Sequence, residues 1–160
     1  MKVKKKAYQT NRLACLILLV LVSTSTWAQD AKSRIYVGSD TCLQCHQAEY
    51  ENYRKYARKS HSFQSVQKMK KGLTPDEIRG CYACHTTGYG KPGGFVSVEQ
   101  TPELKNAGCE VCHGPGGRHA ETEDPDDIIQ DVTIDVCQKC HTKERVRAFR
   151  YTPMVHGGGH

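Results

Sequence analysis

The sequence predicts a small, mostly α-helical fold with few or no strands. Residues 47–71 contain neither proline nor glycine, and Gly72 then supplies a C-terminal stop signal. Helix-start signals recur farther along, at Thr74, Thr101 and Thr133. Only two short pieces, residues 34–37 and 95–98, have the composition of extended chain.

The predicted helices follow these signals in order. Within residues 47–71, one face carries side chains at spacings of three, four and four: Tyr50, Tyr53, Ala57 and His61. Thr74-Pro75-Asp76-Glu77 combines a capping box with proline at the first helical position, which predicts a short helix. Thr101-Pro102 and Thr133 predict two more. Between them, residues 88–94 form a glycine-rich loop, and residues 121–127 an acidic surface loop rather than a catalytic pair of carboxylates.

The first 28 residues differ from the rest of the chain. They hold five of the 23 basic residues and none of the 17 acids, so residues 29–160 carry 18 bases against 17 acids. A basic start, the apolar run Leu13–Val22 and Thr26-Trp27-Ala28 predict a secretory signal peptide over 1–28, with Gln29 starting the mature chain. An uncleaved anchor is the alternative. Residues 29–160 are then one domain, whose balanced charge argues against nucleic-acid binding.

Eight cysteines remain after the leader, and they fall into four C-x-x-C pairs. Histidine follows each pair at once, as His46, His85, His113 and His141. The pairs are Cys42/Cys45, Cys81/Cys84, Cys109/Cys112 and Cys137/Cys140. C-x-x-C-H is the attachment motif of c-type haem. Two thiols one helical turn apart can form thioethers with one edge of a porphyrin, and the next imidazole can ligate the iron.

Other chemistries explain this pattern less well. Disulfides occur in exported proteins, but they do not require a histidine after each pair. Zinc binds two C-x-x-C pairs, and a thioredoxin-like site needs only one pair. The sequence therefore predicts four covalent haem c groups, which with the lysine-rich leader indicates a bacterial periplasm. About 33 residues per haem cannot build an ordinary core, so we expect the fold to wrap around the four haems.

Four histidines lie outside the motifs, and three of them are predicted as distal iron ligands. His119 follows His113 by six residues, too short a tether to reach the far face of the same haem, so it should ligate a neighbouring iron. His61 and His156 complete the predicted set. His160 ends a glycine tail and is not assigned.

Beyond the motifs, the chain resembles the tetrahaem cytochrome c-554 family over most of residues 36–156. The resemblance rests on Tyr36-Val37-Gly38-Ser39, Ser60-His61, residues 81–94 (CYACHTTGYGKPGG) and, most strongly, residues 108–119 (GCEVCHGPGGRH). It implies a mostly α fold around stacked haem pairs, and periplasmic electron transfer linked in nitrifiers to hydroxylamine oxidation. It also implies three bis-histidine irons and one five-coordinate iron, which by motif order is that of Cys81, Cys84 and His85.

Three functions follow as hypotheses. The first is an electron carrier between redox proteins, a donor and an acceptor that include multihaem oxidoreductases, and it is favoured because no acid–base pair or nucleophile stands out. The second is an enzyme that binds or reduces nitric oxide, nitrite or hydroxylamine at an open iron. The third is an electron-transfer subunit of a larger oxidoreductase. Nucleic acid, and membrane insertion after cleavage of the leader, are not expected.

Overall fold

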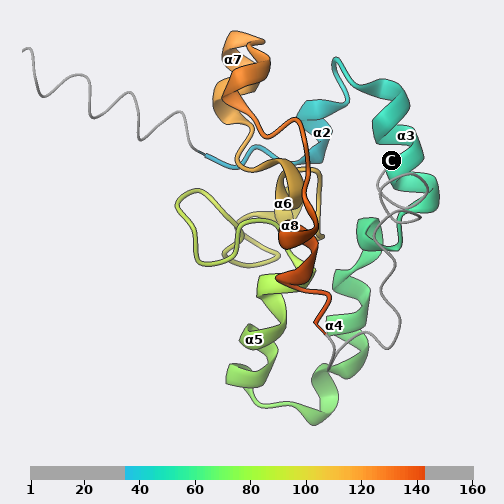
Figure 1. Ribbon diagram of the computed structural model, residues 1–160. Helices are drawn as coiled ribbons and strands as arrows, with labels where there is room; N and C mark the ends of the chain where they lie inside the picture. The colour runs from blue at the N-terminus through green and yellow to red at the C-terminus, as the bar shows by residue number, and fades with distance from the viewer. Residues whose placement is uncertain (1–34, 143–160) are drawn as a thin grey trace, which may run out of the picture. The chain divides into compact units, whose positions relative to one another are not determined.

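The computed structural model describes residues 35–142, and this part of the chain is helical (Figure 1). Its α-helices are α2 Ser39–Cys42, α3 Gln47–Tyr56, α4 Phe63–Met69, α5 Pro75–His85, α6 Glu110–His113, α7 Gly117–Thr122 and α8 Ile134–Gln138. Short 3₁₀ turns are η1 Arg58–His61, η2 Lys70–Gly72, η3 Pro102–Leu104 and η4 Pro125–Asp127. No strand occurs within 35–142, which confirms the mostly α fold. The predicted leader, His156 and His160 lie outside the described residues.

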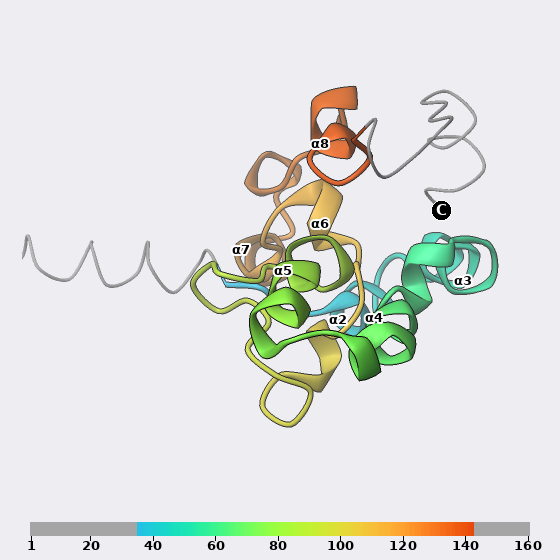
Figure 2. The ribbon, with the colours of Figure 1, turned by 90° about the horizontal axis from the view of Figure 1, so that it is seen from below.

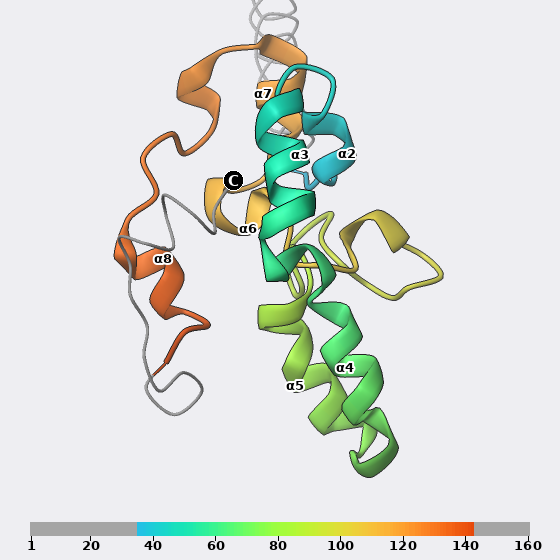
Figure 3. The ribbon, with the colours of Figure 1, turned by 90° about the vertical axis from the view of Figure 1, so that its right-hand side faces the viewer.

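The single helix predicted over residues 47–71 is wrong, because the chain breaks at Ala57. Ala57 has extended backbone angles (φ −83°, ψ 111°) and is buried, so α3 ends before it and η1 begins after it (Figure 3). Contacts from distant segments stabilise the break: Ser62 Oγ donates to the His85 carbonyl, and the Phe63 amide donates to Asn106 Oδ1. His61 consequently does not continue the face that carries Tyr53.

The helix start predicted at Thr74 is confirmed. Thr74 Oγ1 accepts a hydrogen bond from the Glu77 amide, the Thr74 amide donates one to the Glu77 carboxylate, and Pro75 is the first helical residue. The resulting helix α5 continues to His85, so it contains the second cysteine motif. Thr101 and Thr133 are also N-caps, of η3 and α8, although neither side chain makes a capping hydrogen bond.

A small hydrophobic core lies where α4, α5 and the loop after α5 meet. It consists of Phe63, Val66, Phe95 and Leu104, and the ring of Tyr82 packs on two of them. Helices α4 and α5 lie side by side in Figures 1 and 3. Tyr36, from the chain before α2, also packs against this core.

The loop after α5 is closed by backbone hydrogen bonds. The Lys91 amide donates to Gly88, and the Phe95 amide donates to Thr87, which brings Phe95 into the core. Residues 95–98 form no strand there, and neither do residues 35–37. Thr87 then reaches the chain before α6, because its hydroxyl lies 2.6 Å from the Asn106 carbonyl and accepts from the Gly108 amide at 2.9 Å.

Helix α6, with the third cysteine motif, lies near the middle of the described helices in Figures 1, 2 and 3. The acidic segment predicted as a loop is partly helical, because α7 runs to Thr122 and η4 follows at Pro125–Asp127. Within the described residues, no helix is both long enough and apolar enough to cross a membrane.

Candidate cofactor-attachment site

Each of the four cysteine motifs is wound into one helical turn. The amide of the motif histidine donates to the carbonyl of the first cysteine at 2.8 Å for His46, 3.1 Å for His113 and 2.9 Å for His141. The second motif makes the same turn inside α5, which ends at His85. Residues three and four apart share a helix face, so both thiols and the imidazole of each motif lie on one side of the turn. No disulfide joins any of the eight motif cysteines, all of which lie within the described residues.

Backbone carbonyls orient the rings of three histidines. Nδ1 lies 2.9 Å from the Ser62 carbonyl in His85, 2.7 Å from the Ile129 carbonyl in His113, and 2.9 Å from the Asp124 carbonyl in His119. A carbonyl oxygen can only accept, so Nδ1 of each ring donates, and Nε2 is the nitrogen that a neutral ring can offer to a metal. Metal-ligating histidines typically donate their other ring N–H to a backbone carbonyl or a carboxylate in this way. His119 shares it with two motif histidines although it belongs to no motif.

His119 faces the histidine of the first motif rather than that of its neighbour in sequence. The ring centroids of His46 and His119 lie 6.2 Å apart, with 31° between the ring planes. Metal–imidazole bonds of about 2 Å, as in zinc sites, separate the centroids of two imidazoles on opposite sides of one metal by about 6 Å. The two rings are therefore spaced for one shared metal ion.

The motifs contact one another in an order different from that of the chain. The thiol of Cys42 hydrogen bonds to Cys109, which lowers the pKa of Cys109 to about 6 and raises the pKa of Cys42. Burial, with a smaller effect of Cys112, raises the pKa of Cys137. Cys140 Sγ lies 4.0 Å from the carbonyl of Ala83, inside the second motif. In space the third motif thus contacts the first, and the fourth contacts the second, while Thr87 joins the chain after the second motif to Gly108 before the third.

Two comparisons with known proteins agree with this geometry. The family model "Cytochrome c554 and c-prime" matches residues 41–114, which hold the first three motifs. Cytochrome c-554 of Nitrosomonas europaea is 30% identical over 115 residues, covering 65% of this chain and 47% of that protein. Both matches support a relationship to the cytochrome c-554 family. It spans about half the length of this curated relative, and no solved structure matches it.

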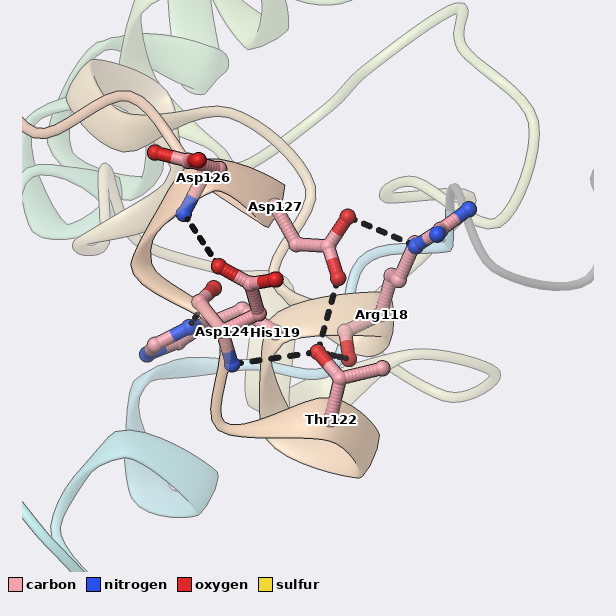
Figure 4. A network of polar contacts seen from close by, with 6 residues as sticks. All are labelled: Arg118, His119, Thr122, Asp124, Asp126 and Asp127. Carbon is pink, nitrogen blue, oxygen red and sulfur yellow. Dashed lines mark hydrogen bonds and ion pairs between the residues drawn. The ribbon is translucent and has the colours of Figure 1, made fainter.

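A polar network holds the turn that orients His119. Arg118 Nε donates to Asp127 Oδ1 at 2.6 Å, and Thr122 Oγ1 donates to Asp127 Oδ2 at 2.7 Å (Figure 4). The Asp124 carboxylate accepts from the Asp126 amide, which closes η4. The sequence prediction of a solvated acidic loop missed this role, because the atom that meets His119 is the backbone carbonyl of Asp124.

The other histidines predicted as iron ligands are His61, His141 and His156. His61 ends η1 and is exposed, while Lys59 of the same turn lies 3.9 Å from Cys112 Sγ of the third motif. Burial, and to a lesser degree the Lys59 ammonium, lower the pKa of His141, which favours the neutral imidazole that binds metals. His156 lies outside the described residues.

Two functional residues escaped sequence reasoning. Ser62 lies between the second and third motifs in space, because its hydroxyl donates to the His85 carbonyl and accepts from the Ala107 amide, each at 2.9 Å. Glu110, between the two cysteines of the third motif, is only 2% exposed. A carboxylate so deeply buried needs several donors, but these come from segments far away in sequence, so local pattern gives no signal for them.

Proposed function

We propose that the chain is a periplasmic multihaem c-type cytochrome that carries single electrons between redox proteins through four covalently bound haem c groups. The observation that carries the proposal is the common turn of the four motifs, each with two cysteine side chains and one imidazole on one face. The similarity to cytochrome c-554 and to the matching family model supports it.

The residues present fit the proposed group. Thioether attachment requires two reduced thiols on one helical turn, and all four motifs supply them. Axial ligation requires neutral imidazoles with a fixed tautomer, and backbone carbonyls fix the tautomer in His85 and His113. When bound, haem iron supplies a one-electron redox couple. The chain's part is to attach each group, provide its axial ligands and set the spacing between groups.

His119 is the proposed distal partner of His46. Their 6.2 Å centroid separation and the Asp124 carbonyl behind His119 support this pairing. In this pairing His119, six residues after the third motif, ligates the iron of the first motif. Two imidazole ligands would give the iron a lower reduction potential than an imidazole and a methionine sulfur, since a methionine ligand raises the potential. His61 and His156 remain predicted ligands of other irons.

The spatial order of the motifs supports electron transfer along the molecule. Contacts link the first motif to the third through Cys42 and Cys109, and the fourth to the second through Cys140 and Ala83. Ser62 links the second motif to the third, because it donates to the His85 carbonyl and accepts from the Ala107 amide. Groups attached at neighbouring positions can exchange electrons edge to edge, so we propose that electrons pass between the motifs that these contacts join.

Intact mass spectrometry and electron paramagnetic resonance test the proposed function. Protein expressed with the haem-maturation machinery should carry four haem masses on a chain that starts at Gln29. The ferric protein should show low-spin irons, including the His46–His119 pair. A variant with Cys81 and Cys84 both replaced by alanine should lose one haem mass and keep three. Fewer than four haems in the unmodified chain, or bound zinc, contradicts the proposal.

A further inference from the structure

Glu110 holds a buried carboxylate against three backbone amides. Its oxygens accept from the Val37 amide at 3.0 and 3.2 Å, from the Gly38 amide at 2.8 Å and from the Gly116 amide at 2.7 Å. Glu110 itself is 2% exposed. Hydrogen bonds to a charged acceptor are stronger than those between neutral groups, and they are stronger still away from water. The carboxylate thus links three segments firmly.

The three amides lie where two short helices begin. Gly38 is the N-cap of α2, which carries Cys42 and leads to His46, and Gly116 is the N-cap of α7, which carries His119. Neither N-cap makes a side-chain hydrogen bond of its own. Glu110 therefore supplies, from the third motif, the acceptor that both helix starts lack in their own sequence.

Helix α2 leads to His46 and helix α7 contains His119, and the rings of these two histidines lie 6.2 Å apart. Close packing accompanies the carboxylate at this junction. The Gly117 amide donates to the Ile35 carbonyl at 3.1 Å, and a Cβ on Gly117 would come within 2.8 Å of the Ile35 side chain. Glu110 is the charged group of the junction, and its hydrogen bonds to both helix starts fix how far the His46 segment stands from the His119 segment.

We propose that Glu110 is a positioning residue for the axial ligands of the first-motif iron, although it belongs to the third motif. This inference rests on the proposed function, because it assumes that His46 and His119 share an iron. The carboxylate is needed rather than an amide of the same shape. A glutamine side chain has one acceptor oxygen, and its NH₂ group can only donate, so at least one of the three amides loses its acceptor.

The test compares Glu110→Gln with Glu121→Gln in the full-length haem-loaded protein. Glu121 lies in α7 and is exposed, so its variant makes the same chemical change outside the junction. Cyanide is the probe: it binds a five-coordinate ferric iron directly, but a bis-histidine iron only where a histidine ligand leaves, so the slower binding phase reports the bis-histidine irons. We expect cyanide to displace one histidine about tenfold faster in Glu110→Gln, since a lost hydrogen bond to a charged group is of that size. Glu121→Gln should match the unmodified protein.

A second comparison shows whether Glu110 acts through His119. His119→Ala alone should turn the first-motif iron high-spin, and adding Glu110→Gln to it should change the spin count no further. If Glu110 acted only on general stability, Glu110→Gln would change the spin state of other irons as well. The double variant would then have more high-spin irons than His119→Ala alone. Glu110→Asp keeps the charge on a shorter side chain and is the variant to use if Glu110→Gln fails to mature. Cyanide should displace one histidine faster in Glu110→Asp than in the unmodified protein.

The outcomes separate this inference from the proposed function. Suppose that the unmodified protein carries four haems with bis-histidine irons, and that Glu110→Gln and Glu110→Asp bind cyanide at the unmodified rate. This result overturns the role of Glu110 but agrees with the proposed function. An unmodified protein without a bis-histidine signal overturns the proposed function itself. Faster exchange in Glu110→Gln that persists fully in the His119→Ala background assigns the effect to another iron and also overturns the inference.

Discussion

Ser62 and His85 exchange two hydrogen bonds across 23 positions of sequence. Ser62 Oγ donates to the His85 carbonyl, and His85 Nδ1 donates to the Ser62 carbonyl, both at 2.9 Å. The pair connects the start of α4 to the end of α5, where the second motif lies. Ser62 thus orients His85, and the extended backbone at Ala57 places the start of α4 where Ser62 can make these hydrogen bonds.

Ser62→Ala should destabilise the protein and loosen His85. The Ala107 amide then loses its acceptor and the His85 carbonyl loses one donor, which should cost about 1–3 kcal/mol for the buried group left unpaired. Urea denaturation followed by circular dichroism measures the loss. Ser65→Ala, at an exposed position of α4, is the matched control and should change stability by less than about 0.5 kcal/mol. Equal effects of the two variants would contradict the assigned role.

Two glycine substitutions should act in opposite directions. A Cβ on Gly94 would lie 1.8 Å from the Gly88 carbonyl oxygen, so Gly94→Ala must force the loop open and should cost about 3 kcal/mol or more. Gly80 lies inside α5 with nothing within 4 Å of its added Cβ. Gly80→Ala should therefore stabilise the protein by about 0.5–1 kcal/mol. Thermal denaturation of both variants checks the signs, and a stable Gly94→Ala would show that the loop closes differently.

Local signals in the sequence predicted the parts of this structure that depend on neighbouring residues. The capping box at Thr74 and the turn of each cysteine motif need only residues within four positions, and both are confirmed. The break at Ala57 could not be predicted, because no glycine or proline marks it and the contacts that stabilise it come from His85 and Asn106. Glu110 escaped for the same reason: its three amide partners include two that lie more than 70 positions away.

Asp127 should make stability depend on acid pH. The hydrogen bond from Thr122 and then the Arg118 guanidinium lower the pKa of Asp127 below its usual range. A carboxyl whose pKa is lower in the folded state stabilises fully above the unfolded pKa, about 3.9, and loses that contribution as pH falls through the folded value. Urea midpoints of the unmodified protein should therefore drop more steeply below about pH 4 than those of Asp127→Asn.

The exposed Asp131 is the control for this measurement. Asp131→Asn should keep the steep drop, whereas Asp127→Asn should be less stable at neutral pH and converge with the unmodified protein at the acid end. Since Asp127 braces the turn that presents the Asp124 carbonyl to His119, the Asp127 variant should also weaken the low-spin signal of one iron. If the urea midpoints of the two variants changed with pH in the same way, Asp127 would have no special part in the acid dependence.

Basic side chains on the segment from α3 to η2 should steer an acidic redox partner. Six exposed members and one half-buried member lie there: Arg54, Lys55, Arg58, Lys68, Lys70, Lys71 and Lys59. Rates of association with an acidic partner should fall steeply as salt rises, because screening shortens the reach of surface charge. Lys70→Glu with Lys71→Glu should slow association at low salt, while Lys91→Glu, in the loop after α5, should not. A salt-independent rate would make these residues ordinary solvated helix faces.

His119→Ala should convert one low-spin iron to high-spin while all four haems stay attached. The affected iron should be that of Cys42, Cys45 and His46, because the rings of His46 and His119 lie 6.2 Å apart and the Asp124 carbonyl holds His119 in the ligating tautomer. The open iron should then bind cyanide, and electron paramagnetic resonance should show one more high-spin centre than before. His160→Ala provides the control at a histidine that is not assigned as a ligand. A change confined to the haem of Cys109 and Cys112 would place His119 on its own motif's iron instead, which its five-residue tether makes difficult.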